Sequence, residues 1–296
     1  MKEVFGAIEA GGTKFVCAVG TNPNELYDEI RFPTTTPKET IQHCIEYFKM
    51  QQGKYLLKSV GIGSFGPLDL RKDSPTFGFI TKTNKTGWTN TNFLGVLKKE
   101  LNIPIEIDTD VNAAALGEYY WGAGKGFNDF LYLTIGTGIG GGAIVNGKLL
   151  HGFNHPEMGH ILIPHNKDDD NICNFHNDCL EGFASGPAIE NLWKQKAESL
   201  PPEHIAWNNE VDYIAKAVVN YMLILAPKRI IIGGGVMEQK HLFPMIREKV
   251  KKYLNGYIHL PEIINNLGEY IVPPELGNKA GILGAIALAK LSYNNN

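Results

Sequence analysis

Two glycine-rich turns, each between two apolar stretches, constrain the fold of this chain more than any other feature. The first lies in VFGAIEA-GGT-KFVCAVG at residues 4–20, and the second in FLYLTIGTGIGGGAIVNGKLL at residues 130–150. Apolar stretches of this length around glycines are typical of β-hairpins. The second stretch also contains Asn146-Gly147, a signal for a type I′ hairpin turn. One design repeated near the start and the middle of the chain predicts two similar α/β halves.

The remaining pattern alternates helical and strand-like segments. Apolar residues at helical spacing predict helices at 37–52, 93–101, 111–121, 189–197 and 211–225. Buried-strand patterns occur at 57–63, 103–107 and 229–232, and the last leads into Gly233-Gly234-Gly235. We expect an N-terminal α/β domain at 1–115 and a C-terminal α/β domain with a metal-binding loop at 116–279. A small-residue helix at 280–292 is expected to join the first domain.

Composition excludes several classes of protein. The formal charge of −3, with no block of basic residues, argues against nucleic acid or an anionic membrane as the main partner. No run of eighteen apolar residues predicts a transmembrane helix, and Glu3 and Glu9 interrupt any secretory signal at the start. Cys17 and Cys44 fall in a predicted strand and helix and are expected to be buried free thiols. We therefore expect a cytoplasmic protein.

The glycine turns suit the binding of phosphate groups. Glycine lets the backbone approach an anion closely, and successive N–H groups can surround phosphate oxygens. Neither turn is a P-loop, because GxxxxGK[ST] is absent, and neither is followed by the helix of a dinucleotide-binding fingerprint. The alternative is that both are tight hairpins whose glycines need positive φ. Two turns in matching places, with a third glycine run at 233–235, favour an ATP cleft.

Asp110 is the candidate for chemistry among the carboxylates. It lies in Ile107-Asp108-Thr109-Asp110-Val111-Asn112, between a predicted strand and a predicted helix. A carboxylate at the C-terminal end of a strand and near a helix N-terminus is in a usual place for chemistry in α/β folds. An aspartate here could equally cap the helix. The local sequence leaves both roles open.

Four sulfur and nitrogen ligands occur close together in the second half. Cys173, His176 and Cys179 follow His160 upstream, and together they form a closed set of two thiolates and two imidazoles. Such a set favours a structural zinc ion. His155 and His165 are alternative fourth ligands. A redox pair is disfavoured because CxxC is absent, and a loop with reduced cysteines is the remaining alternative.

Several stretches together resemble one family. They are IEAGGTKF, GIGSFGPLDL, SPTFGFITKT, IDTDVNAAALGE, LTIGTGIGGG, HPEMGH, CLEGFASGPAIE and RIIIGGGV, from residue 8 to beyond residue 235. The chain resembles the ROK family of bacterial sugar kinases and, within it, the fructokinases. The hairpins also resemble the wider actin/hexokinase/Hsp70 ATPase superfamily. The resemblance implies an α/β fold of two RNase H-like (actin/hexokinase-type ATPase) domains flanking an ATP and sugar cleft.

The resemblance assigns roles to individual residues. Asp110 matches the catalytic aspartate, and Glu9 is expected to reach Mg²⁺ through water. For the sugar, the implied residues are Glu157, His160, Glu181, Asn112, Gly66 and Pro67, although Asn112 could serve packing instead. For ATP, they are Gly11, Gly12, Thr13, Lys14, Thr137, Gly138, Pro187, Gly234 and Gly235. Zinc at His160, Cys173, His176 and Cys179 would hold Glu157 and Glu181 in place, although His176 stands where the family commonly has cysteine.

The implied activity is transfer of a phosphoryl group from Mg-ATP to a hexose. Fructose is the favoured acceptor, with glucose and mannose as alternatives, and a homodimer is expected. A sugar-responsive ROK repressor would need a DNA-binding extension, for which five residues before the first hairpin leave no room. An ATP-dependent chaperone or filament protein would have no reason to carry the cysteine and histidine cluster.

Overall fold

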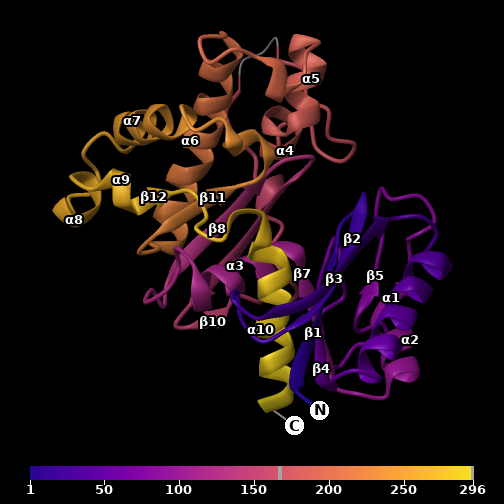
Figure 1. Ribbon diagram of the computed structural model, residues 1–296. Helices are drawn as coiled ribbons and strands as arrows, with labels where there is room; N and C mark the ends of the chain where they lie inside the picture. Colours follow the sequence, from indigo (N-terminus) through magenta and orange to yellow (C-terminus); the bar gives the residue numbers. More distant parts are fainter. Residues whose placement is uncertain (166–168, 295–296) are drawn as a thin grey trace. The chain divides into compact units, whose positions relative to one another are not determined.

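The computed structural model describes residues 1–165 and 169–294, which form two units (Figure 1). Unit 1 comprises Met1–Lys125, Leu149–Pro156 and Leu276–Asn296, and unit 2 comprises Gly126–Lys148 and Glu157–Glu275. Each unit contains a five-stranded mixed sheet with helices packed against it. The domain boundary near residue 115 stays a prediction.

The sheet of unit 1 has the order β3-β2-β1-β4-β7. Its strands are β1 (Glu3–Ala10), β2 (Lys14–Gly20), β3 (Leu26–Pro33), β4 (Leu56–Ser64) and β7 (Ile105–Thr109). β1, β2 and β3 pair antiparallel, which confirms the first hairpin, while β1, β4 and β7 pair parallel. A short hairpin, β5 (Phe79–Ile80) with β6 (Thr91–Asn92), lies outside this sheet.

Alternation along the strands gives this sheet two apolar faces. Ile8 and Phe15 point to one face, where they pack in a core with residues of α1 (Pro37–Gln52) and α2 (Phe93–Leu101). Ala7 and Ala18 point to the opposite face, where they pack against α10 (Ala280–Asn294). Because side chains in a strand alternate with a period of two, β1 and β2 serve both cores at once.

Within unit 1, α10 packs against α3 and β4 (Figure 1), and its small residues allow a very close approach. A Cβ atom on Gly284 would lie 1.6 Å from the carbonyl oxygen of Ala113 in α3 (Asp110–Trp121). A Cβ on Gly61 of β4 would lie 2.0 Å from the carbonyl oxygen of Ala285. These distances are far below any real contact, so only glycine fits at either position. α10 thereby fixes α3, the helix that begins with Asp110, against the sheet.

The sheet of unit 2 has the order β10-β9-β8-β11-β12. Its strands are β8 (Phe130–Ile135), β9 (Ile139–Val145), β10 (Lys148–Leu149), β11 (Ile230–Gly233) and β12 (Ile271–Val272). β8 and β9 form the second predicted hairpin, while β8, β11 and β12 run parallel. Asn146 and Gly147 both have positive φ, as the predicted type I′ turn requires.

Helices and short 3₁₀ turns complete unit 2. They are η1 (Met158–His160), α4 (Leu180–Ala184), α5 (Gly186–Trp193), η2 (Ala197–Ser199), α6 (Ala206–Leu225), η3 (Gly235–Glu238), α7 (Leu242–Leu254), α8 (Pro261–Ile264) and α9 (Leu267–Tyr270); η4 (Gly277–Lys279) precedes α10 in unit 1. α6 packs on α7 and α4. Among the helices of the described residues, none combines the length and apolarity that crossing a membrane requires.

Candidate active site

The turn between β1 and β2 is closed by backbone hydrogen bonds. The Gly11 N–H donates to the Lys14 carbonyl (3.0 Å), and the Thr34 hydroxyl donates to the Gly11 carbonyl (2.7 Å). A Cβ on Gly11 would lie 2.9 Å from the Lys14 oxygen, so the turn itself requires this glycine. Gly12 and Thr13 are exposed, and a Cβ on Gly12 would meet nothing within 4 Å. Packing of the protein does not explain Gly12, whereas the close approach of an anion would.

The turn between β8 and β9 is held by a carboxylate. The Ile139 N–H donates to Glu181 Oε2 (2.8 Å), and a Cβ on Gly138 would lie 2.7 Å from the same oxygen. The Gly136 carbonyl accepts the N–H of Gly186 at the start of α5 (2.7 Å). Thr137, at the tip, is exposed. Glu181 therefore fixes the backbone of a turn that was predicted to bind ATP.

The glycine run after β11 lies beside that turn. Gly234 has φ of +94°, and a Cβ there would lie 2.3 Å from the Ile135 carbonyl oxygen, so it requires glycine on both grounds. A Cβ on Gly136 would lie 3.6 Å from the Gly235 nitrogen. Pro187 follows Gly186, which is bonded to Gly136, and is exposed. The fold of unit 2 thus brings together the residues predicted there for ATP: Thr137, Gly138, Pro187, Gly234 and Gly235.

The glycines of the two hairpin turns do not adopt positive φ. Gly11, Gly12, Gly136 and Gly138 are all outside the left-handed region, in contrast to Gly234. The alternative that these turns use glycine for its positive φ is therefore wrong. Close approach of backbone or carboxylate explains Gly11 and Gly138 instead.

Asp110 is the first residue of α3, but it is not the cap of this helix. Thr109 occupies the cap position, and its hydroxyl accepts the N–H of Asn112 (3.1 Å). The Asp110 carboxylate accepts the N–H of Val111 (2.9 Å). The sequence allowed Asp110 to be either the helix cap or a residue for chemistry, and the structure shows that Asp110 is not the cap. Thr109 therefore caps the helix, while the Asp110 carboxylate bonds within the first turn, where the positive end of the helix dipole favours its negative charge.

Glu9, at the end of β1, is a second carboxylate, and the charge of Asp110 acts on it. Burial is the main cause that raises the pKa of Glu9 to about 7, and the negative charge of Asp110 raises it further. Lys14 and Arg31 act in the opposite direction. A Cβ on Gly281 would lie 2.8 Å from Glu9 Cδ, so glycine in α10 makes room for this carboxyl. Two mutually repelling carboxylates form a donor set that suits Mg²⁺.

Asp108 and Asn112 form a buried polar cluster beside Asp110. Asp108 Oδ1 accepts the Thr109 N–H (2.8 Å) and the Asn112 side-chain amide (2.7 Å). Its other oxygen lies 2.9 Å from His151 Nε2. Asn112 Oδ1 is buried without a hydrogen-bond partner among the described residues. The amide nitrogen of Asn112 therefore serves the packing of α3, and its contact with sugar stays a prediction.

The loop after β4 carries Gly66 and Pro67 and is held by two side chains from residues 149–156. The Leu68 N–H donates to His155 Nε2 (3.0 Å). Asn154 accepts the Leu70 N–H (3.0 Å) and donates to the Leu68 carbonyl (2.7 Å). His155 thus contacts a loop of unit 1, and the metal-ligand set that the structure forms does not include it.

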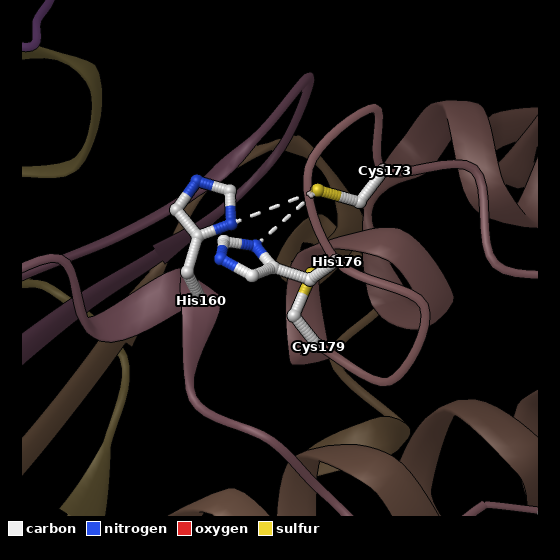
Figure 2. A group of neighbouring side chains, drawn as sticks. All are labelled: His160, Cys173, His176 and Cys179. Carbon is white, nitrogen blue, oxygen red and sulfur yellow. Dashed lines mark hydrogen bonds between the residues drawn. The ribbon is translucent and has the colours of Figure 1, made fainter.

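Four ligand atoms meet in unit 2, from His160, Cys173, His176 and Cys179 (Figure 2). All lie within 4.8 Å of one another, and Cys173 Sγ is 3.9 Å from His160 Nδ1 and 3.7 Å from His176 Nδ1. Tetrahedral zinc with bonds of roughly 2.0–2.3 Å places its ligands somewhat under 4 Å apart. Burial is the main cause that raises the pKa of Cys179 to about 11. The set therefore fits a structural cation, which would stabilise the thiolate.

Backbone hydrogen bonds join the chain segments that carry the four ligands. Ile163 N–H donates to the Asp178 carbonyl, and Leu180 N–H donates to the Ile161 carbonyl, both at 3.0 Å. Asn171 accepts the Cys173 N–H (2.8 Å) and donates to the Cys179 carbonyl (3.1 Å). Asn171 was not predicted, although an asparagine two residues before a cysteine is a signal for such a turn.

His160 connects this cluster to Glu181. Its Nδ1 faces Cys173, while its Nε2 lies 3.8 Å from Glu181 Oε1. Glu181 in turn holds the β8–β9 turn through Ile139. Glu157 is exposed, and its carbonyl accepts the His160 N–H (3.1 Å). The other predicted alternative, His165, pairs with Asp178 (3.1 Å).

The comparisons with known proteins agree with one family. The model of the ROK family matches residues 5–292, so the chain belongs to the ROK family. A Bacillus subtilis (strain 168) protein named "Putative fructokinase" is 52% identical, over 97% of this chain and 95% of its own length. A fructokinase of Pediococcus pentosaceus is 44% identical, over 99% of both chains.

Solved structures show the same fold at lower identity. A ROK hexokinase from Thermus thermophilus matches with a TM-score of 0.82 and 24% identity, over 99% of this chain and 100% of that one. A ROK glucokinase from Streptomyces griseus, in complex with glucose and AMPPNP, matches with a TM-score of 0.78 and 23% identity, over 97% and 99%. The chain therefore has the two-unit, hexokinase-type fold that was predicted, and its relatives are sugar kinases.

Proposed function

We propose that this protein is an ATP-dependent hexose kinase that converts fructose to fructose 6-phosphate. The observation that carries the proposal is a pair of neighbouring carboxylates, Asp110 at the start of α3 and Glu9, whose pKa burial and the charge of Asp110 raise to about 7. The fructokinase relatives, at 44% and 52% identity over nearly the whole chain, support fructose as the acceptor.

Asp110 acts as the general base of this reaction. Its carboxylate accepts the proton of the C6 hydroxyl while the hydroxyl oxygen bonds to the γ-phosphorus of ATP. The bond from that phosphorus to the β–γ bridging oxygen breaks, and ADP leaves. A positioned carboxylate contributes about 10²- to 10⁴-fold to such a step.

The glycine-rich turns bind ATP in this proposal. In unit 1 the open surface at Gly12 admits phosphate oxygens, with Gly11, Thr13 and Lys14 beside it. In unit 2, Thr137 and Gly138 bind phosphates, while Pro187, Gly234 and Gly235 border the nucleoside. Glu9 would hold Mg²⁺ through water, and the ion would supply positive charge to neutralise the transferred phosphate. The raised pKa of Glu9 supports this role, because a cation relieves the repulsion between Glu9 and Asp110.

The sugar is bound by carboxylates and by the loop at Gly66 and Pro67. Glu157 and Glu181 accept hydrogen bonds from its hydroxyls. We also assign His160 and Asn112 to sugar binding. Zinc at His160, Cys173, His176 and Cys179 would hold Glu181 in place through His160, whose two ring nitrogens face Cys173 and Glu181. We further propose that the enzyme is a cytoplasmic homodimer.

The proposal is tested by an ADP-release assay with Mg-ATP and fructose, glucose, mannose and N-acetylated hexosamines in turn. We expect kcat/KM to be highest for fructose. Higher values for glucose or mannose would leave the kinase assignment in place and overturn fructose as the preferred acceptor. No ADP release with any of these sugars would overturn the kinase.

A further inference from the structure

A buried carboxylate stands directly behind the proposed base. Asp108 is the penultimate residue of β7, and its side chain is only 6% exposed. It accepts hydrogen bonds from the Thr109 backbone and the Asn112 side chain, which are the cap and the third residue of α3. These bonds fix the turn that carries Asp110. A buried carboxylate with two neutral donors needs a further partner to balance its charge.

His151 is that partner. Its Nε2 lies 2.9 Å from Asp108 Oδ2, and its ring also bonds the backbone of Leu149. Asn112 Nδ2 lies 3.4 Å from the same ring nitrogen. A carboxylate only accepts hydrogen bonds, so His151 Nε2 and Asn112 Nδ2 both donate to Asp108. The two nitrogens are therefore both donors, and their contact with each other is not a hydrogen bond.

The surroundings favour the doubly protonated ring. The hydrogen bond to Asp108 is the main cause that raises the pKa of His151, although burial acts against it. The charged groups acting on the ring are Asp108 and Glu106, both of β7, and α3 contributes only the neutral amide of Asn112. The imidazolium donates from both ring nitrogens, whereas the neutral ring can serve only one of its two acceptors.

We propose that His151 is a positioning residue for phosphoryl transfer, which orients Asp110 by holding Asp108 against the first turn of α3. This inference rests on the proposed function, because it assigns a task to the same site. Nothing in the pattern around His151 predicted it: the residue comes thirty residues after the end of the helix that it supports. Loss of the ring leaves Asp108 buried without its charged partner and frees the turn, so that turnover falls without any change in the groups that react.

The kinetic test compares His151→Ala and His151→Gln with the wild type between pH 6 and 9. We expect roughly tenfold lower kcat for His151→Ala, as for a modest misplacement of a reacting group, with the KM for ATP nearly unchanged. Glutamine can donate one bond at any pH, so His151→Gln recovers most of the activity at pH 8. The ratio of wild-type to His151→Gln kcat falls as pH rises through the pKa of His151, because the wild type then loses its imidazolium.

His43 offers a matched control, since it pairs with Glu46 (4.0 Å) on the exposed surface of α1. His43→Gln should leave both kcat and its pH profile unchanged. Equal kcat for wild type and His151→Ala across the pH range, with both folded, would overturn the proposal. So would a wild-type to His151→Gln ratio that does not vary with pH.

Amide NMR separates failure of this inference from failure of the proposed function. In the wild type, we expect the Thr109 N–H and the Asn112 side-chain amide to shift with the same pKa as the His151 ring, and His151→Gln to abolish the shift. This readout needs no turnover. If the amides titrate but no sugar is phosphorylated, the kinase assignment fails while the coupling stands. If the kinase is active but these amides do not titrate with His151, the positioning role is wrong.

Discussion

Glu9→Gln should stabilise the free protein at alkaline pH and leave its stability unchanged at acid pH. Burial and the charge of Asp110 raise the pKa of Glu9 from 4.5 to about 7. Below pH 4.5 the carboxyl is protonated in both the folded and the unfolded chain and costs nothing. Between pH 4.5 and 7 the unfolded chain releases this proton first, so stability falls as pH rises. The loss reaches about 3 kcal/mol above pH 7, because one pKa unit corresponds to about 1.4 kcal/mol.

The assay is urea unfolding at pH 5 and pH 8. Glutamine keeps the shape of the side chain and cannot ionise, so the gain in free energy of unfolding should be about 3 kcal/mol at pH 8 and under about 1 kcal/mol at pH 5. Glu203→Gln, at an exposed carboxylate, is the matched control and should change stability by under about 0.5 kcal/mol at either pH. A gain for Glu9→Gln of equal size at both pH values would refute the reasoning. Millimolar Mg²⁺ at pH 8 should stabilise the wild type more than Glu9→Gln, if Glu9 serves the cation.

Three further predictions concern the base, the phosphate turn and the metal. Asp110→Asn should lower kcat about 10³-fold while the sugar dissociation constant, measured by calorimetry, stays within a few-fold; near-native turnover would remove Asp110 as the base. Gly12→Ala should melt at the wild-type temperature, since its Cβ meets nothing within 4 Å, and yet raise the KM for ATP; Gly152→Ala, equally uncrowded, is the control, and an unchanged KM would exclude phosphate from this turn. Cys173→Ser should lose bound zinc, measured by elemental analysis, and melt at lower temperature; wild-type protein containing no zinc after purification with the metal supplied would contradict the site.

Local patterns predicted many strands and helices, because the apolar spacing that favours each element lies within neighbouring residues. The hairpins around residues 11–13 and 136–138 and the type I′ turn at Asn146 were predicted correctly, as was the helix at 37–52. The alternative that these turns need glycine for its positive φ was wrong. Positive φ is a local property, whereas the carbonyl of Lys14 and the carboxylate of Glu181 that crowd Gly11 and Gly138 become visible only once the chain has folded.

The sequence alone supplied the chemical types proposed for the site: glycines for phosphate, carboxylates for a proton, and a cysteine–histidine set for a cation. Their spacing left alternatives open, and the resemblance to the ROK family assigned the individual roles. Only the tertiary structure decided which of several chemically similar groups makes each contact. Thr109 rather than Asp110 caps α3, His160 rather than His155 joins the cysteines, and His151 reaches Asp108 from a distant segment. Such choices depend on contacts between segments far apart in the chain, where burial and the pairing of charge, and not sequence spacing, set the free energy.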